Sequence, residues 1–166
     1  MKSCRQCARE GFTLIELLIT IGILGLALAI ALPAFRSFRD SLSRTQARAQ
    51  LIADLRAARQ TSVTRHRSVI VSFAGTTNQT TYTLHTDLNG DQIQQANEPR
   101  SIHVLPKPAK ISTVSIVSSP AHPTSLIFDT SGLLIPGYSG GRLIVTGGRG
   151  RPDTLDVSAV GMVYRP

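Results

Sequence analysis

A short polar stretch in the middle of the chain has the residue types that bind a hard metal cation. Its carboxylate and amide side chains are Asp87, Asn89, Asp91 and Glu98. Oxygen ligands at these intervals partly match a calcium-binding loop, including the carboxylate that closes such a loop. The sixth position of that loop requires glycine, but Gln92 stands there and Gly90 comes two places earlier. We therefore prefer a polar loop between two strands, with Asn89 and Gly90 as its turn, and predict no bound metal.

Four arginines near the C-terminus could bind phosphate groups. They are Arg142, Arg149, Arg151 and Arg165, and the middle two lie in a glycine-rich stretch. Guanidinium groups pair with phosphates, so these residues are candidate contacts to DNA with strongly salt-dependent affinity. The net charge of +8 favours acidic partners in general, whether nucleic acid, anionic lipid or an acidic protein surface. The alternative that stays open is a solvated glycine-rich turn.

One carboxylate lies inside a long apolar stretch. Phe12 to Leu32 contains 21 residues, and Glu16 is its only formal charge. A helix of this length, at ~1.5 Å per residue, can cross the ~30 Å hydrocarbon core of a bilayer. An ionised carboxylate among lipid tails costs on the order of several kcal/mol and needs a partner. The sequence therefore predicts a membrane-spanning helix over 12–32, with a cationic partner for Glu16.

Catalytic chemistry is not indicated by the remaining polar residues. The four histidines show no metal-ligand spacing, and no serine lies in a nucleophile-elbow pattern: His66, His85, His103 and His122. Cys4 and Cys7 supply only two of the four ligands of a structural zinc site. We therefore predict a protein that is not an enzyme and that carries no cofactor.

The apolar stretch is predicted to continue into an amphipathic helix. Apolar residues recur at steps of three and four after Pro33, namely Phe35, Phe38, Leu42, Thr45, Ala49 and Ile52. We expect one helix from Phe12 to about Thr61, with a kink near Pro33, whose second half (33–61) packs on a globular domain. The same segment carries six arginines: Arg36, Arg39, Arg44, Arg48, Arg56 and Arg59. They form either a solvated face or a basic seam that meets acidic neighbours or phospholipid.

From about residue 62 the pattern changes to a period of two with many β-branched residues. The candidate strands are Ser68 to Ala74, Thr80 to Thr86, Arg100 to Leu105, Lys110 to Ser118, Ser125 to Asp129, Arg142 to Thr146, Thr154 to Ser158 and Met162 to Arg165. Glycines and prolines separate them. A long helix followed by strands predicts an α+β fold, with the helix covering an antiparallel β-sheet in a head of residues 62–166.

The segment from Gly11 to Glu16, Gly-Phe-Thr-Leu-Ile-Glu behind a short basic leader, resembles the processing site of type IV prepilins and type II secretion pseudopilins. The resemblance implies that a prepilin peptidase removes residues 1–11 by cutting between Gly11 and Phe12, and that Phe12 is then methylated. Glu16 and Pro33 fall at matching positions of the family pattern. It also implies that Glu16 pairs with the amine of Phe12 on a neighbouring subunit.

Later segments narrow the resemblance to the minor pilins of the FimT/GspH family. They are Leu51 to Arg59, Arg65 to Val69, Phe128-x-x-x-Gly132 and Leu155-Asp-Val-Ser-x-x-Gly161. This resemblance implies a single-pass protein of the inner membrane with a periplasmic head, which an assembly platform adds to a helical fibre of other pilins or pseudopilins. Such a subunit helps to initiate or cap a type II secretion pseudopilus or a type IV pilus.

The resemblance also implies an alternative function in natural transformation. In FimT-type pilins linked to DNA uptake, a Gly-Arg-x-Arg element near the C-terminus is implicated in DNA binding. Residues 148–151 fit that string, Gly-Arg-Gly-Arg. By the order of elements, however, the family's string belongs to the final segment from Gly161 to Tyr164, where only Arg165 follows. The alternative is therefore a DNA-binding minor pilin.

Overall fold

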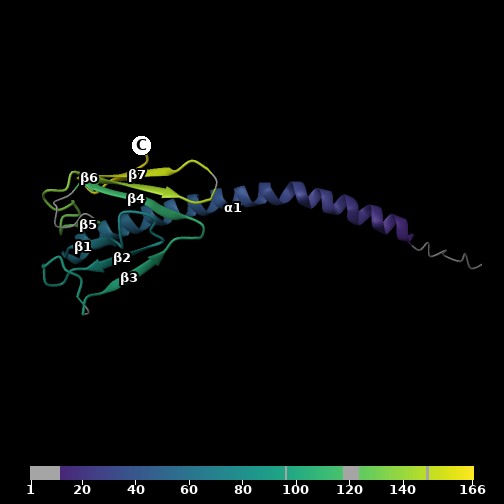
Figure 1. The fold of residues 1–166 in the computed structure, drawn as a ribbon. Helices are drawn as coiled ribbons and strands as arrows, with labels where there is room; N and C mark the ends of the chain where they lie inside the picture. Colours follow the sequence, from purple (N-terminus) through teal and green to yellow (C-terminus); the bar gives the residue numbers. More distant parts are fainter. Residues whose placement is uncertain (1–11, 96, 118–123, 149) are drawn as a thin grey trace, which may run out of the picture. The chain divides into compact units, whose positions relative to one another are not determined.

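The computed structural model describes residues 12–95, 97–117, 124–148 and 150–166, which form one helix and eight strands (Figure 1). The helix is α1 (Leu14–Arg65). The strands are β1 (Val69–Phe73), β2 (Thr81–Thr86), β3 (Arg100–Val104), β4 (Lys110–Val117), β5 (Ser125–Phe128), β6 (Gly140–Thr146), β7 (Asp153–Ser158) and β8 (Val163–Tyr164). The chain divides into two compact units, Met1–Arg36 and Ser37–Pro166. The second half of α1 therefore belongs to the same unit as the strands.

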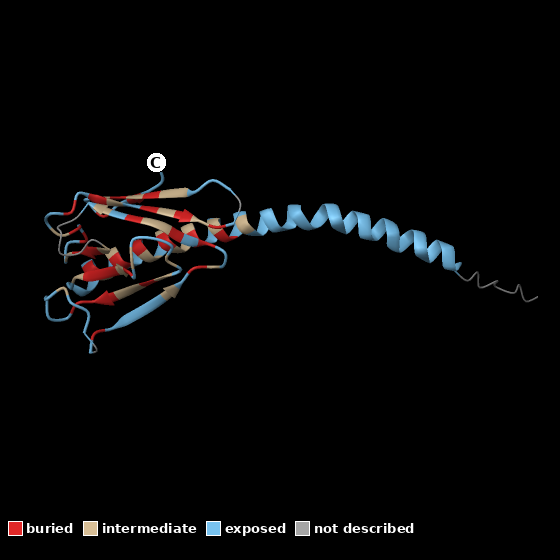
Figure 2. Cartoon of the chain, viewed as in Figure 1, coloured by how far each residue is buried: buried red, intermediate tan, exposed pale blue. Residues whose placement is uncertain are grey.

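In the first unit, the described residues form a helix that is apolar around its whole circumference. Every residue from Phe12 to Arg36 is exposed (Figure 2), and the most apolar 18-residue window has a mean hydropathy of 2.5. By length and composition the helix can cross a membrane. The hydroxyl of Thr20 donates a hydrogen bond to the Leu17 carbonyl oxygen at 2.8 Å, which satisfies it within the helix. The helix continues through Pro33.

In the second unit, the strands form two antiparallel sheets of four strands each. One sheet has the order β3-β2-β1-β5 and the other has the order β4-β6-β7-β8. We expected a single sheet, but β4 leaves β3 and pairs with β6 instead. An isolated bridge between Gln79 and Ile111 links the β1–β2 connection to β4. The predicted α+β class, with one long helix on antiparallel strands, is confirmed.

The second half of α1 packs with a different face from the one predicted. Its buried residues are Ser43, Ala47, Leu51, Leu55, Ala58 and Ser62, whereas Phe35, Phe38 and Leu42 are exposed. Both sets recur at steps of three and four, so periodicity alone did not separate them. The buried set contains small residues, which allow the helix backbone to come close to the sheets. Of the predicted apolar stripe only Ile52 packs against the core, so the predicted face was wrong apart from that residue, although the predicted docking of this half was correct.

Candidate functional site

Of the four arginines proposed to bind DNA, the three that the structure describes do not form one cluster. Arg142 on β6 donates two hydrogen bonds to Asp156 on β7, Nε to Oδ1 at 2.7 Å and Nη2 to Oδ2 at 2.9 Å. These hydrogen bonds raise the pKa of Arg142 and lower the pKa of Asp156. Arg165 lies 3.4 Å from Asp153. Two of the four guanidinium groups therefore already face a carboxylate of their own sheet.

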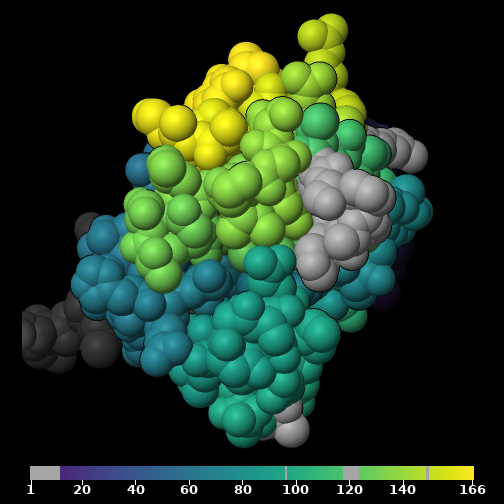
Figure 3. All heavy atoms as spheres, turned by 90° about the vertical axis from the view of Figure 1, so that its left-hand side faces the viewer, coloured from purple at the N-terminus to yellow at the C-terminus, as the bar shows by residue number. Residues whose placement is uncertain are grey.

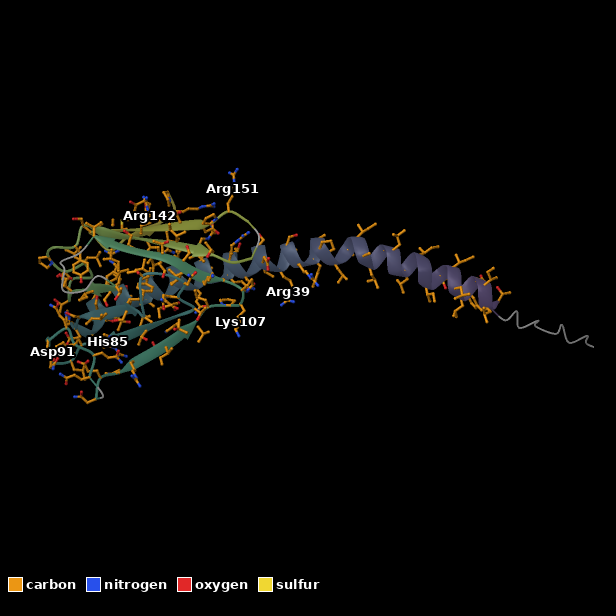
Figure 4. The ribbon with its side chains drawn as sticks, in the orientation of Figure 1. Arg39, His85, Asp91, Lys107, Arg142 and Arg151 are labelled. Carbon is orange, nitrogen blue, oxygen red and sulfur yellow. The ribbon has the colours of Figure 1, made fainter. Side chains whose placement is uncertain are left out.

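Arg151 lies in the connection from β6 to β7, at the opposite end of this strand pair from Arg142 (Figure 4). Arg149 lies outside the described residues. Arg142 is opposite Asp156, four residues before the end of β6, so at ~3.3 Å per residue the two exposed arginines are more than ~10 Å apart along the strand. The described residues of the glycine-rich string, Gly148, Gly150 and Arg151, therefore lie in the connection at one end of the sheet.

A basic groove between α1 and the C-terminal residues was not predicted. It has a volume of about 500 Å³ and is lined by Arg48, Ala49, Ile52, Ala53, Arg56 and Arg165. Arg48 lies 3.7 Å from Asp153, the same carboxylate that Arg165 contacts. The sequence placed Arg48 and Arg56 in a helical seam and Arg165 at the C-terminus. Only the tertiary fold brings the three side chains around one groove.

The loop after β2 brings the carboxylates of the calcium candidate together. One oxygen from each of Asp87, Asp91 and Glu98 lies within 4.8 Å of the others. The oxygens of Asp87 accept hydrogen bonds from the backbone N–H groups of Gly90 and Gln92, and those of Glu98 accept from Leu88 and Gln95. Backbone donors of the loop itself therefore hold both buried carboxylates in place.

Two further residues of this loop, Asp91 and Gln92, bear on its fit to a calcium-binding loop. The backbone N–H of Ile93 donates to Asp91 Oδ1 at 2.8 Å and is the main cause that lowers the pKa of Asp91. Gln92 adopts a φ of 61°, the left-handed conformation for which a calcium-binding loop uses glycine. The loop lies at the end of the head that Figure 3 faces, in the teal part of the surface. A polar loop with a turn at Asn89 and Gly90 remains our interpretation.

His85 is a buried histidine next to this loop. Its side chain is 3% exposed, and neither ring nitrogen has a hydrogen-bond partner among the described residues. Burial lowers its pKa, while the negative charges of Glu98 and Asp87 act in the opposite direction. His85 is therefore held as a neutral ring with two unpaired polar atoms, an arrangement that costs stability.

Replacing His85 with leucine is expected to raise the free energy of unfolding by about 1 kcal/mol near pH 7, because it removes two unpaired buried atoms. The folded pKa lies below the unfolded value of about 6.5, so protonation destabilises the wild type as the pH falls below that value. The variant should lose this part of the pH dependence. Urea unfolding of the full chain in detergent at several pH values measures both effects, with the exposed His66→Asn as control. An unchanged pH slope in His85→Leu would contradict the prediction.

A second polar group that the sequence did not indicate ties α1 to the first sheet. The carboxylate of Asp54 accepts a hydrogen bond from the Tyr82 hydroxyl and pairs with His103 Nδ1 at 2.7 Å. The rings of Tyr82 and His103 stack at 5.3 Å, and Ser101 Oγ lies 3.0 Å from His103 Nε2. Although Ser101, His103 and Asp54 contact in the order of a hydrolase triad, the carboxylate also holds the tyrosine and joins helix to sheet. We interpret the group as structural.

Glu16 lies in the first turn of α1 and is exposed. The Thr13 hydroxyl oxygen accepts a hydrogen bond from the Glu16 backbone N–H at 3.3 Å, so Thr13 is the N-cap of the helix. Within the described residues Glu16 makes no ion pair. Gly11, Cys4 and Cys7 lie outside those residues. The cap was not predicted, although the spacing Thr-x-x-Glu is its usual sequence signal.

The long helix, apolar at its start and packed on antiparallel sheets at its end, is the architecture of type IV pilin-like subunits. Residues 47–161 match the family described as Type II transport protein GspH, and residues 7–32 match the prokaryotic N-terminal methylation motif. Since the first match spans more than half of the sequence, the chain belongs to the GspH family. Family and fold point to a structural subunit rather than an enzyme, and to one that is anchored in a membrane by its N-terminal helix.

Two crystal structures of the type IV minor pilin FimU of Pseudomonas aeruginosa have the same fold. One has a TM-score of 0.54 at 13% identity and covers 79% of this chain and 90% of that one. The other has a TM-score of 0.53 at 16% identity and covers 74% and 91%. The type IV major alpha-pilin of Moraxella bovis is 46% identical over 46 residues. These residues are 28% of this chain and 29% of that relative, so the chain matches less than a third of its length.

The methylation motif and the family match agree with each other and together cover most of the chain. They confirm the predicted class of minor pilin or pseudopilin. The scissile bond and the roles of Glu16, Pro33 and the arginines stay predictions.

Proposed function

We propose that this protein is a minor pilin or pseudopilin that helps to initiate or cap a helical fibre, either a type II secretion pseudopilus or a type IV pilus. A prepilin peptidase cuts between Gly11 and Phe12 and methylates Phe12. The precursor crosses the inner membrane once and keeps its head in the periplasm, where an assembly platform adds it to other subunits. Glu16 docks on the amine of a neighbouring Phe12.

The observation that carries this proposal is the exposed apolar start of α1, which carries a single carboxylate, Glu16, in its first turn. A helix that is apolar on all sides finds partners only in lipid or among similar helices. The carboxylate of Glu16 then has its most favourable partner in a cationic group within the same apolar layer. The head supplies the surfaces that select neighbouring subunits.

Processing provides the direct test of this proposal. In its native host, mass spectrometry should find a chain that starts at Phe12, with one added methyl group, and that lacks both cysteines. A Gly11→Leu variant should stay at precursor mass, because the peptidase would no longer recognise the site. Purification of an intact leader from wild-type cells would overturn the proposal.

The alternative, a DNA-binding minor pilin for natural transformation, is supported by the groove that Arg48, Arg56 and Arg165 line. Several guanidinium groups around one groove can contact successive phosphates of a DNA backbone. In this second hypothesis the fibre still assembles, and the head retains DNA at its surface.

For the alternative we expect Arg56→Gln with Arg165→Gln to weaken duplex binding and to reduce the slope of log affinity against log salt by about 2. Arg142→Gln is the control, because two hydrogen bonds of 2.7 and 2.9 Å hold that guanidinium on Asp156, whereas Arg165 makes one longer contact of 3.4 Å with Asp153. Filter binding of the full chain over a salt series measures the slope. If the slope of log affinity against log salt is the same in the wild type, the groove variant and the control, this groove is not a DNA site. The structural function would then be the one that stands.

A further inference from the structure

Three segments of the head meet beside residues 43 and 44 of α1. The hydroxyl of Ser43 donates to the Lys107 carbonyl oxygen at 2.9 Å, which fixes the β3–β4 connection on the helix. Arg44 Nη1 donates to the Gly147 carbonyl oxygen at 3.2 Å, which fixes the β6–β7 connection. A Cβ at Gly147 would lie 2.9 Å from Ala109 Cα, so the two connections also touch each other.

This end of the head is strongly basic. The exposed basic residues at this end are Arg39 on α1, Lys107 in the β3–β4 connection, Lys110 at the start of β4 and Arg151 in the β6–β7 connection, and we call these four residues the basic collar. Arg39, Lys107 and Arg151 project around the same end in Figure 4. Asp40 is the one acidic residue in the described parts of 37–44, 105–110 and 147–152. The collar therefore carries an excess of positive charge from three separate segments.

The collar lies close in sequence to the apolar segment. Arg39 follows Leu32 by seven residues, so at no more than ~3.6 Å per residue the chain keeps Arg39 within about 25 Å of the end of the apolar segment. The headgroup layer on each side of a bilayer is about 5 to 8 Å thick, so a chain of this length reaches the boundary between headgroups and water. Basic residues at this boundary attract anionic lipid.

We propose that the basic collar binds the anionic phospholipid headgroups of the membrane in which the apolar segment is inserted. The lipid phosphates would lie against Arg39, Lys107 and Arg151, and the head would rest on the membrane surface until the subunit is extracted. Each basic residue near an anionic surface favours contact on the order of fivefold. This inference rests on insertion of the apolar segment and is independent of which fibre the subunit joins.

Amide hydrogen exchange of the full chain in lipid nanodiscs tests the collar. We compare discs of phosphatidylcholine alone with discs that contain about 30% phosphatidylglycerol. Exchange in peptides that cover 105–111 and 146–153 should be slower in the anionic discs by on the order of fivefold or more, and the difference should disappear near ~0.5 M salt.

Two triple variants with the same change in net charge separate the collar from a general charge effect. The first variant changes the collar and should abolish the difference in exchange between the two kinds of disc: Arg39→Gln, Lys107→Gln and Arg151→Gln. The second variant changes other exposed arginines and should retain this difference: Arg56→Gln, Arg65→Gln and Arg100→Gln. Equal exchange in both kinds of disc, or loss in both variants, would overturn the proposal. If added duplex DNA slows amide exchange in the collar peptides in neutral discs, and anionic lipid does not, the collar would be assigned to nucleic acid instead. A chain that fails to enter the discs would overturn both the anchor and the collar.

Discussion

Glu16→Ala is expected to leave the chain in the membrane but to remove it from the fibre. Removing a charge makes the apolar segment more favourable in lipid, so the membrane pool should not fall. In the fibre, the variant would leave the amine of a neighbouring Phe12 unpaired in an apolar layer. Loss of one partner from a buried ion pair costs about 3–5 kcal/mol. We therefore expect the fibre-bound fraction to fall by at least about an order of magnitude.

Immunoblots of sheared fibres and of membranes measure this fraction. Thr20→Ala is the control, because it lies one turn further along the same apolar segment and its hydroxyl bonds only within the helix. The control should assemble as the wild type does. Fibre incorporation of Glu16→Ala at the wild-type level would mean that the carboxylate does not dock the subunit.

Gly140→Ala is expected to produce the largest loss of stability in the head. Gly140 begins β6 with a φ of 125°, a conformation that residues with a Cβ rarely adopt. An added Cβ would lie 2.4 Å from the carbonyl oxygen of Val157 on the neighbouring strand. Backbone strain of about 1–3 kcal/mol adds to this steric conflict, so we expect a total loss of about 3 kcal/mol or more.

Gly141→Ala is a matched control from the next position. Its added Cβ would lie 3.4 Å from the flexible side chains of Ile116 and Leu126, and no positive φ opposes it. The control should change the free energy of unfolding by less than about 1 kcal/mol. Thermal unfolding followed by circular dichroism measures the midpoint temperature of each variant. Gly140→Ala should lower this temperature by roughly 10 °C or more, and Gly141→Ala should not. Similar midpoints for both variants would refute the backbone argument.

The sequence predicted the elements of the fold well because each depends on local chemistry. The apolar run from Phe12 to Leu32 and the alanine-rich continuation defined α1 to within four residues of its C-terminal end. The alternation of β-branched residues placed all eight strands. Which strands share a sheet depends on contacts between distant segments, and the division between β3 and β4 has no local signal.

The predictions of side-chain location were less successful for the same reason. Asp54 lies in the same helical segment as the predicted arginine seam, yet its carboxylate contacts Tyr82 and His103 of the first sheet. Four C-terminal arginines were candidate phosphate contacts, with a solvated glycine-rich turn as the open alternative, whereas Arg142 is paired with Asp156 and Arg151 lies at the other end of the strand pair. Sequence spacing shows which residues are neighbours along the chain, but not which acid neutralises which base.

The position of the Thr13 cap has a consequence for maturation. The cap and the first helical turn lie entirely on the retained side of the proposed cut, so the leader can leave without unwinding the helix. The cut would create an ammonium group at the positive end of the helix dipole, which is an unfavourable place for a cation. Glu16 in that turn offsets the new charge from the moment of its formation. Before it joins the fibre, a matured subunit would thus keep the first turn of its helix and an N-terminal ammonium group whose charge Glu16 offsets.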